Sequence, residues 1–210
     1  MRAITRWLVW CGGIGGAICL LLYLLVFDVW LFDPGNDAQL AASAVPALKP
    51  GDKVLLRRGS TPGFGELVRC EHPDSPGTWV VGRIFGVRGD RVEVSDGTIQ
   101  TNGKGLSAAH GCPQQVVPHP VTQNLVTLSC GVVETGAWSF EYLNAPEHMS
   151  GGTHSALVEA GKVYLVSDNR FMHQDSRDFG QVDETTCRHV VFRLWGESYT
   201  DSSRRFTVLW

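Results

Sequence analysis

The chain has 210 residues, of which 43% are hydrophobic and 19% are charged, and its formal net charge is −3. This length allows one buried core of roughly 150–180 residues beyond an N-terminal apolar segment. The small negative charge and the lack of a Lys/Arg cluster exclude the basic surface typical of nucleic-acid-binding proteins.

The N-terminal segment is predicted to cross a membrane. From Trp7 to Phe27 the chain carries no formal charge, and as a helix this run is long enough to cross about 30 Å of hydrocarbon. Arg2 and Arg6 precede the run and Asp28 and Asp33 follow it, which favours a cytoplasmic N-terminus. The alternative, a cleaved signal peptide, is disfavoured because the run is long and bulky residues follow it.

The sequence therefore divides into two parts. Residues 1–32 are predicted to form a cytoplasmic tip and a single-pass anchor in the inner (cytoplasmic) membrane, with the lipid bilayer as partner. Residues 33–210 are predicted to form a periplasmic or other extracytoplasmic domain. Gly12 and Gly16 form a small-xxx-small pair that would let the anchor pack against a second helix.

The sequence of the exported part predicts short strands separated by turns. Apolar residues alternate or cluster over strand lengths, and Gly, Asp and Pro mark the turns between them. Long helical periodicity is absent after the anchor. These patterns predict a mainly β, antiparallel domain. The candidate strands are 53–57, 66–70, 79–85, 91–94, 124–128, 162–166, 190–194 and 206–209.

Four cysteines lie in the exported part, and they allow three disulfide pairings: Cys70, Cys112, Cys130 and Cys187. We favour Cys112 with Cys130, because both fall in region 104–160, which carries no recognisable motif and would gain most from a covalent link. The chain contains no Cys-x-x-Cys spacing and no His-x-x-Glu-His type pair, so no metal site is expected.

A dense polar turn follows the apolar stretch 163–166. Two Asp-containing clusters lie seven residues apart and are followed by Gly180. Asp, Asn and Ser side chains bond nearby backbone groups, and an Arg beside a carboxylate is a rigid two-pronged partner. Such a concentration of fixed polar groups indicates an organised site. The clusters consist of Asp168, Asn169 and Arg170, and of Asp175, Ser176 and Arg177.

This segment resembles the most diagnostic signature of the type I signal peptidase family, the membrane-bound serine proteases of peptidase group S26. The family pattern is Gly-Asp-Asn-Arg, three positions ending in Ser, one further residue and Asp-Ser-Arg. Here Ser167 replaces the Gly and His173 replaces the Ser. Three similar motifs occur upstream in the family's order: 43–52 (Ser-Ala-Val-Pro-Ala-Leu-Lys-Pro-Gly-Asp), 65–69, and 83–90 followed by Asn102-Gly103.

The resemblance implies a nucleophile and reveals a missing base. Ser43 occupies the position of the family's nucleophilic Ser. The family's general base is a Lys that stands immediately before Arg83, where this chain has Gly82. Ala41 stands where the family often carries a hydroxyl that helps to hold the oxyanion, and losing such a donor typically costs about 10²–10³ in rate.

His173 is the candidate replacement for the missing amine. In the family, the Ser at this position bonds the catalytic Lys, so a His there starts close to the vanished amine, and Gly82 is expected to leave empty volume beside it. Imidazole is largely unprotonated at neutral pH. We therefore predict a Ser43/His173 dyad, with Asp175 or Asp168 orienting the imidazole. Otherwise His173 is a polar loop residue in a decayed site.

The other polar residues of this region are expected to support the site. The family places an Asp–Arg salt bridge here, and Asp175 is the expected acid, with Arg177 or Arg83 as its partner. No cofactor is implied. The supporting residues are Asp168, Asn169, Asp175, Ser176, Arg177 and Arg83.

The resemblance implies a membrane-anchored serine endopeptidase of the signal peptidase I type, which cleaves signal peptides from exported preproteins after small residues at −1 and −3. One alternative is a catalytically inactive relative that binds signal peptides, lipids or a neighbouring peptidase, and Gly82 and Ala41 are its evidence. Another is a processing protease with a dedicated substrate, which the substitutions Ala44 and Ala47 would suit.

Overall fold

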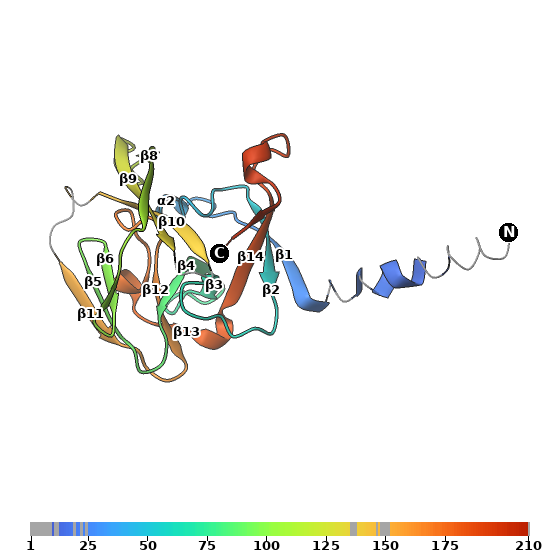
Figure 1. Cartoon of the computed structure of the whole chain (residues 1–210), viewed down its shortest axis with the longest axis horizontal. Coiled ribbons are helices and arrows are strands. Elements are labelled where there is room, and N and C mark those ends of the chain that lie inside the picture. The colour runs from blue at the N-terminus through green and yellow to red at the C-terminus, as the bar shows by residue number, and fades with distance from the viewer. Residues whose placement is uncertain are drawn as a thin grey trace.

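The computed structural model describes the chain except residues 1–9, 11–12, 19, 22, 24, 135–137, 146, 148–151 and 210. Beyond residue 26, the described residues form three antiparallel β-sheets, two short α-helices and short 3₁₀ helices (Figure 1). The predicted mainly β, antiparallel fold class is therefore confirmed. The helices are α2 (Ala38–Ser43), α3 (Ser176–Phe179), η2 (Glu184–Thr186) and η3 (Ser202–Arg204).

The largest sheet has eight strands in the order β1-β2-β14-β3-β4-β12-β13, and β15 pairs with β14 beside this path. Strands β4 and β12 are buried over nearly their whole length, which indicates that both of their faces are covered. The strands are β1 (Phe27–Leu31), β2 (Lys53–Arg57), β3 (Leu67–Glu71), β4 (Trp79–Gly86), β12 (Lys162–Val166), β13 (Val182–Asp183), β14 (Arg188–Trp195) and β15 (Thr207–Val208).

Two smaller sheets complete the domain, one ordered β10-β9-β8 and the other β11-β5-β6-β7. The predicted Asn-Gly hairpin is confirmed: Asn102 and Gly103 both have positive φ and form the two-residue turn between β6 and β7. The strands are β5 (Arg91–Ser95), β6 (Thr98–Thr101), β7 (Lys104–Leu106), β8 (His110–Pro118), β9 (Leu125–Glu134), β10 (Ser139–Asn144) and β11 (Thr153–Leu157).

The sequence located most strands of the large sheet and few in the rest of the domain. Strands β2 and β12 have the predicted bounds, and β3, β4, β5, β9, β14 and β15 overlap their predicted ranges. Region 104–160, in which only 124–128 was predicted as a strand, contains all of β7, β8, β10 and β11 as well. Strands β7, β8 and β11 are largely exposed, so they lack the buried apolar runs of β4 and β12.

Helix α2 is held against the large sheet by apolar packing. Leu40, Ala44 and Leu48 from the helix and the turn after it pack with Val54 and Leu56 of β2 in one buried cluster. A fully buried aliphatic side chain of this size stabilises the fold by about 1.5–3 kcal/mol. The end of α2, where Ser43 lies, is therefore fixed by the core.

The N-terminal prediction falls partly outside the described residues: Arg2, Arg6, Trp7 and Gly12 are not described. The described residues between Trp10 and Val26 are helical and mostly exposed, and they lie away from the β domain (Figure 1). Among the residues that the structure describes, no helix is long and apolar enough to cross a membrane. Around Gly16, a Cβ would meet no atom within 4 Å.

Strand β1 occupies residues that the sequence interpretation assigned to the anchor. Phe27 to Leu31 pair along their whole length with β2, so the large sheet begins before the predicted domain boundary at residue 33. The change from helix to strand was concealed because only Asp28 separates the apolar residues of β1 from those of the preceding run. Trp30 of this strand packs partly buried against the core, and its ring lies 5.1 Å from the Arg69 guanidinium.

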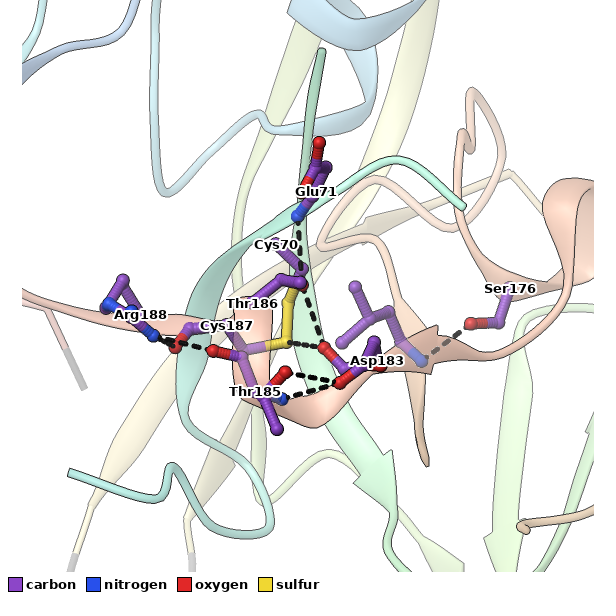
Figure 2. The surroundings of a disulfide bond; sticks show 9 residues. Cys70, Glu71, Ser176, Asp183, Thr185, Thr186, Cys187 and Arg188 are labelled. Atoms are coloured by element: carbon purple, nitrogen blue, oxygen red, sulfur yellow. Dashed lines mark hydrogen bonds between the residues drawn. A yellow bond between two sulfur atoms is a disulfide. The ribbon is translucent and has the colours of Figure 1, made fainter. Parts of the chain in front are cut away.

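Two disulfides cross-link the domain. The predicted Cys112–Cys130 pair is confirmed and joins β8 to β9. The second disulfide joins Cys70 on β3 to Cys187, which directly precedes β14 (Figure 2). Beside it, the backbone N–H of Glu71 donates to the Thr186 hydroxyl at 3.2 Å, so a covalent bond and a hydrogen bond hold the same strand end.

Candidate active site

Ser43 is the last residue of helix α2, which begins at its N-cap, Asp37. The residue is fully buried, and its Oγ donates to the Leu40 carbonyl at 3.0 Å. This back-bonding to residue i−3 is common for Ser in short helices. The sequence placed Ser43 before a Pro-rich turn, and the structure adds the helix that precedes this turn. In the unliganded protein, the hydroxyl proton is therefore engaged within the chain.

Asn169 connects the Ser43 segment to the polar turn after β12. Its backbone N–H donates to the Ser43 carbonyl at 3.1 Å, and its Nδ2 donates to the Ala42 carbonyl at 3.0 Å. Its Oδ1 accepts from the Met172 N–H at 3.0 Å. The predicted supporting residue thus lies, fully buried, at the junction of the two segments that the sequence assigned to one site.

Asp175 is the centre of the polar turn. Its buried carboxylate accepts from Arg177 Nε at 2.9 Å and Nη2 at 2.7 Å, and from the Ser167 N–H at 2.7 Å. Burial acts to raise the pKa of Asp175, but the bonds and charge of Arg177, with smaller effects from His173 and Ser167, lower it below its ordinary value. The predicted Asp175–Arg177 salt bridge is confirmed. Ser176 supports the same turn, because its Oγ accepts from the Leu165 N–H at 2.9 Å.

Arg83 pairs with Asp168 and not with Asp175. The Arg83 Nε lies 2.7 Å from Asp168 Oδ1, and both side chains are buried. Arg83 also donates to the Gly65 carbonyl at 3.0 Å and lies over the Phe140 ring at 4.1 Å. Burial raises the pKa of Asp168, although Arg83 and Arg170 act in the opposite direction. This second ion pair fixes β4 to the start of the polar turn.

His173 belongs to the same polar turn, and its side chain is partly exposed. Its backbone carbonyl accepts from Gln39 Nε2 at 2.7 Å, and its Nδ1 lies 2.8 Å from Asp178 Oδ2. In the part of the chain that the structure describes, no hydrogen bond joins the His173 imidazole to Ser43. The structure therefore brings the backbone of the His173 turn onto helix α2 but does not form the predicted dyad contact in the unliganded state.

Sequence reasoning missed Asp178 as the partner of the imidazole. It expected Asp175 or Asp168, but the carboxylate of Asp175 is occupied by Arg177 and Ser167, and that of Asp168 faces Arg83. The available signal was the spacing Asp175-x-x-Asp178, which is a capping box at the start of α3. Ligand atoms of His173, Asp175 and Asp178 lie within 4.8 Å of one another, and the contacts above account for this grouping.

The expected empty volume beside Gly82 is absent. A Cβ at Gly82 would lie 3.2 Å from the Val166 carbonyl oxygen and 3.3 Å from Leu165 Cβ. The reason is that β12 lies directly beside β4 and pairs with it through a register shift. The neighbouring strand therefore takes up the space that the prediction left for His173.

We predict that Gly82→Ala destabilises the protein by about 1–2 kcal/mol, because a Cβ here crowds the backbone of β12. Urea unfolding of the full chain measures the change. The control is Gly63→Ala, where a Cβ meets no atom within 4 Å and φ is ordinary, so stability should be unchanged or raised by up to about 1 kcal/mol. Equal responses of the two variants would contradict the crowding at Gly82.

The sequence matches a known protein family over most of its length. The family model "Signal peptidase, peptidase S26" matches residues 11–195, which include Ser43, Arg83 and the polar turn. The chain belongs to this family. Family membership does not by itself assign roles to Ser43 and His173, so these roles stay predictions.

Two known members of the family match most of the chain. Signal peptidase IB of Staphylococcus aureus is 33% identical over 180 residues, covering 82% of this chain and 84% of its own length. Signal peptidase I V of Bacillus subtilis is 26% identical over 182 residues, covering 85% and 94%. A crystal structure of a signal peptidase I from Enterococcus faecalis aligns with a TM-score of 0.40 and 21% identity, over 63% of this chain and 97% of that one.

Proposed function

We propose that the protein is a membrane-anchored serine endopeptidase that removes signal peptides from exported preproteins, with Ser43 as nucleophile and His173 as general base. Membership of the signal peptidase family supports the substrate class. The observation that carries the assignment of the base is the Gln39–His173 bond, because Gln39 belongs to the same short helix as Ser43. This bond ties the His173 backbone to the element that bears the nucleophile.

In the proposed reaction, His173 Nε2 takes the proton of Ser43 Oγ while the oxygen attacks the scissile carbonyl carbon. The imidazolium then gives this proton to the leaving amine as the peptide bond breaks. A water molecule attacks the acyl-Ser43 ester, giving one proton to the same nitrogen, which returns it to Ser43. Atoms and charges balance without a cofactor.

Substrate binding must bring the two groups together, because Ser43 is buried and bonded to Leu40 in the unliganded chain. Releasing the hydroxyl is cheap, since the Leu40 carbonyl also accepts from the Ala44 N–H at 3.3 Å and keeps that partner. A net hydrogen bond of this kind contributes about 0.5–1.5 kcal/mol. Catalytic hydrogen bonds commonly tighten only in the substrate complex.

A cavity suited to a substrate chain lies next to the nucleophile segment. It has a volume of about 560 Å³, and its lining includes Pro46 and Ala47, which follow Ser43 in the chain, and Phe140. Charged side chains, among them Arg83 and Glu134, also line it, so the cavity offers both apolar and charged surface to a substrate.

We expect Ser43→Ala and His173→Ala each to lower cleavage of a preprotein signal peptide by the detergent-solubilised full chain by about 10²–10⁴. Ser155→Ala and His154→Ala are the matched controls, because both residues are exposed on β11 and have no part in the site. Turnover equal to wild type in the Ser43 variant removes this residue from the mechanism, and the same result for His173 removes the dyad.

The second candidate is a family member that binds signal peptides without cutting them. Two observations favour it: Ser43 is completely buried, and Gly82, at the family's Lys position, lies so close to β12 that even a Cβ there is crowded. Binding of a fluorescent signal peptide with no cleavage by wild type, unchanged by Ser43→Ala, would establish this function and exclude the first.

A further inference from the structure

We propose that Asp178 is a positioning residue that holds the His173 imidazole with Nδ1 protonated and Nε2 free to accept a proton. The inference rests on the proposed function for its catalytic meaning. Its structural content, which nitrogen of His173 carries the hydrogen, stands independently of that function.

One carboxylate oxygen of Asp178 makes two contacts. Its Oδ2 lies 2.8 Å from His173 Nδ1 and accepts from the Asp175 backbone N–H at 3.0 Å. An ionised carboxylate only accepts hydrogen bonds, so the neutral imidazole must present N–H at Nδ1. Nε2 then keeps its lone pair and is the nitrogen that can act as a base.

Asp178 is itself held in place as the third residue of helix α3. The Asp175 and Asp178 side chains form a reciprocal capping box at the N-terminus of α3. Asp175 is in turn fixed by Arg177 and Ser167 inside the buried turn. Asp178 is thus tied to the buried Asp175 by two hydrogen bonds, one at its carboxylate and one at its backbone N–H.

The backbone of His173 is fixed from the other direction by helix α2, through Gln39. The carbonyl of His173 is bound by Gln39 and its Nδ1 by Asp178. Among the described residues, its Nε2 has no protein hydrogen-bond partner. Because the Asp178 side chain is 42% exposed, its charge is partly screened, and its main effect is on the tautomer and direction of the ring.

The direct test reads the tautomer of His173 in the full chain by imidazole ¹⁵N chemical shifts, in wild type and in Asp178→Ala. We expect the Nδ1–H form to predominate in neutral His173 of wild type and to lose its predominance in Asp178→Ala. An unchanged tautomer would overturn the proposal. Asp178→Asn, whose amide oxygen can still accept at both bonds, should keep the wild-type tautomer.

A matched control separates positioning from helix capping. Asp201 caps the short helix η3 through the Ser203 N–H at 3.0 Å, and it is exposed. Asp201→Ala should therefore leave the His173 spectrum unchanged, whereas a change there as large as in Asp178→Ala would reduce Asp178 to a structural cap.

Steady-state kinetics test whether the positioning of His173 by Asp178 contributes to catalysis. In an active preparation, Asp178→Ala should lower kcat about tenfold with KM within about twofold, well short of the ~10⁴-fold loss at a fully buried Asp–His pair. Asp178→Asn should recover part of this loss. If Ser43→Ala shows that the proposed function fails, the tautomer result still stands; if the tautomer is insensitive to Asp178 in an active enzyme, only this inference fails.

Discussion

Replacing both Cys70 and Cys187 with Ala should destabilise the protein by about 5 kcal/mol, the largest single loss that the structure predicts. The disulfide spans 117 residues of sequence, and closing so long a loop removes much of the unfolded chain's conformational freedom. Both sulfurs lie in a buried apolar cluster with Val68, Ile84 and Leu165, so Ala avoids burying a hydroxyl there. Urea unfolding of the full chain, followed by Trp fluorescence, measures the loss.

The other disulfide is the control. Cys112 and Cys130 are separated by 18 residues, for which the same loop argument gives about 3 kcal/mol. The longer loop should therefore cost about 1.7 kcal/mol more when opened. Measuring both pairs of variants with thiols reduced and oxidised separates the covalent link from the loss of side-chain volume. Equal costs for the two disulfides would contradict the loop argument.

Strands such as β4 and β12 of the large sheet were predictable because burial along the whole strand imposes a recognisable apolar pattern. Strand β12 is an apolar run between turn residues and has the bounds that the sequence predicts. Strand β1 was hidden because only Asp28 separates its apolar residues from those of the preceding helix. Strands β8 and β10 escaped prediction for two reasons. They have exposed polar positions, and they form strands only through pairing with β9, which is a tertiary contact.

In the candidate site, contacts between residues close in sequence were predictable. Contacts that depend on how separate strands pack were not. The Asp175–Arg177 pair follows from two residues of one turn. The partner of Arg83 could not be chosen between acids from sequence, because the choice depends on how β4 lies against the end of β12. The space beside Gly82 was misjudged for the same reason, since a glycine leaves room only where no neighbouring strand fills it.

Asp175→Ala should destabilise the protein by about 3–5 kcal/mol, the second of the two largest effects. The substitution leaves the Arg177 guanidinium buried without its carboxylate and removes the acceptor of the Ser167 N–H. Equilibrium unfolding in urea measures the change. Asp183→Ala is the control, because Asp183 also caps a short helix but is exposed, and its loss should cost about 1 kcal/mol.

A double-mutant cycle tests whether the cost arises from the stranded charge. Asp175→Ala combined with Arg177→Met removes both members of the pair, so no buried charge remains. The double variant should lose clearly less stability than the sum of the two single variants, with a coupling of about 1–3 kcal/mol. Additive losses would mean that Arg177 finds another partner when Asp175 is absent.

The pH dependence of the same variant gives an independent check on the electrostatics. The pKa of Asp175 is lower in the folded chain than in the unfolded one, because Arg177 outweighs the effect of burial. Its contribution to stability is therefore fully present above the ordinary Asp pKa of about 3.9 and is lost as pH falls through the folded-state value. The deficit of Asp175→Ala should accordingly be largest near about pH 7 and shrink towards about pH 3. Asp168, whose pKa burial raises, acts with the opposite sign in both proteins and cancels from the comparison. A deficit that is constant over this range would show that Asp175 stabilises the turn by hydrogen bonding that survives protonation, and not by its charge.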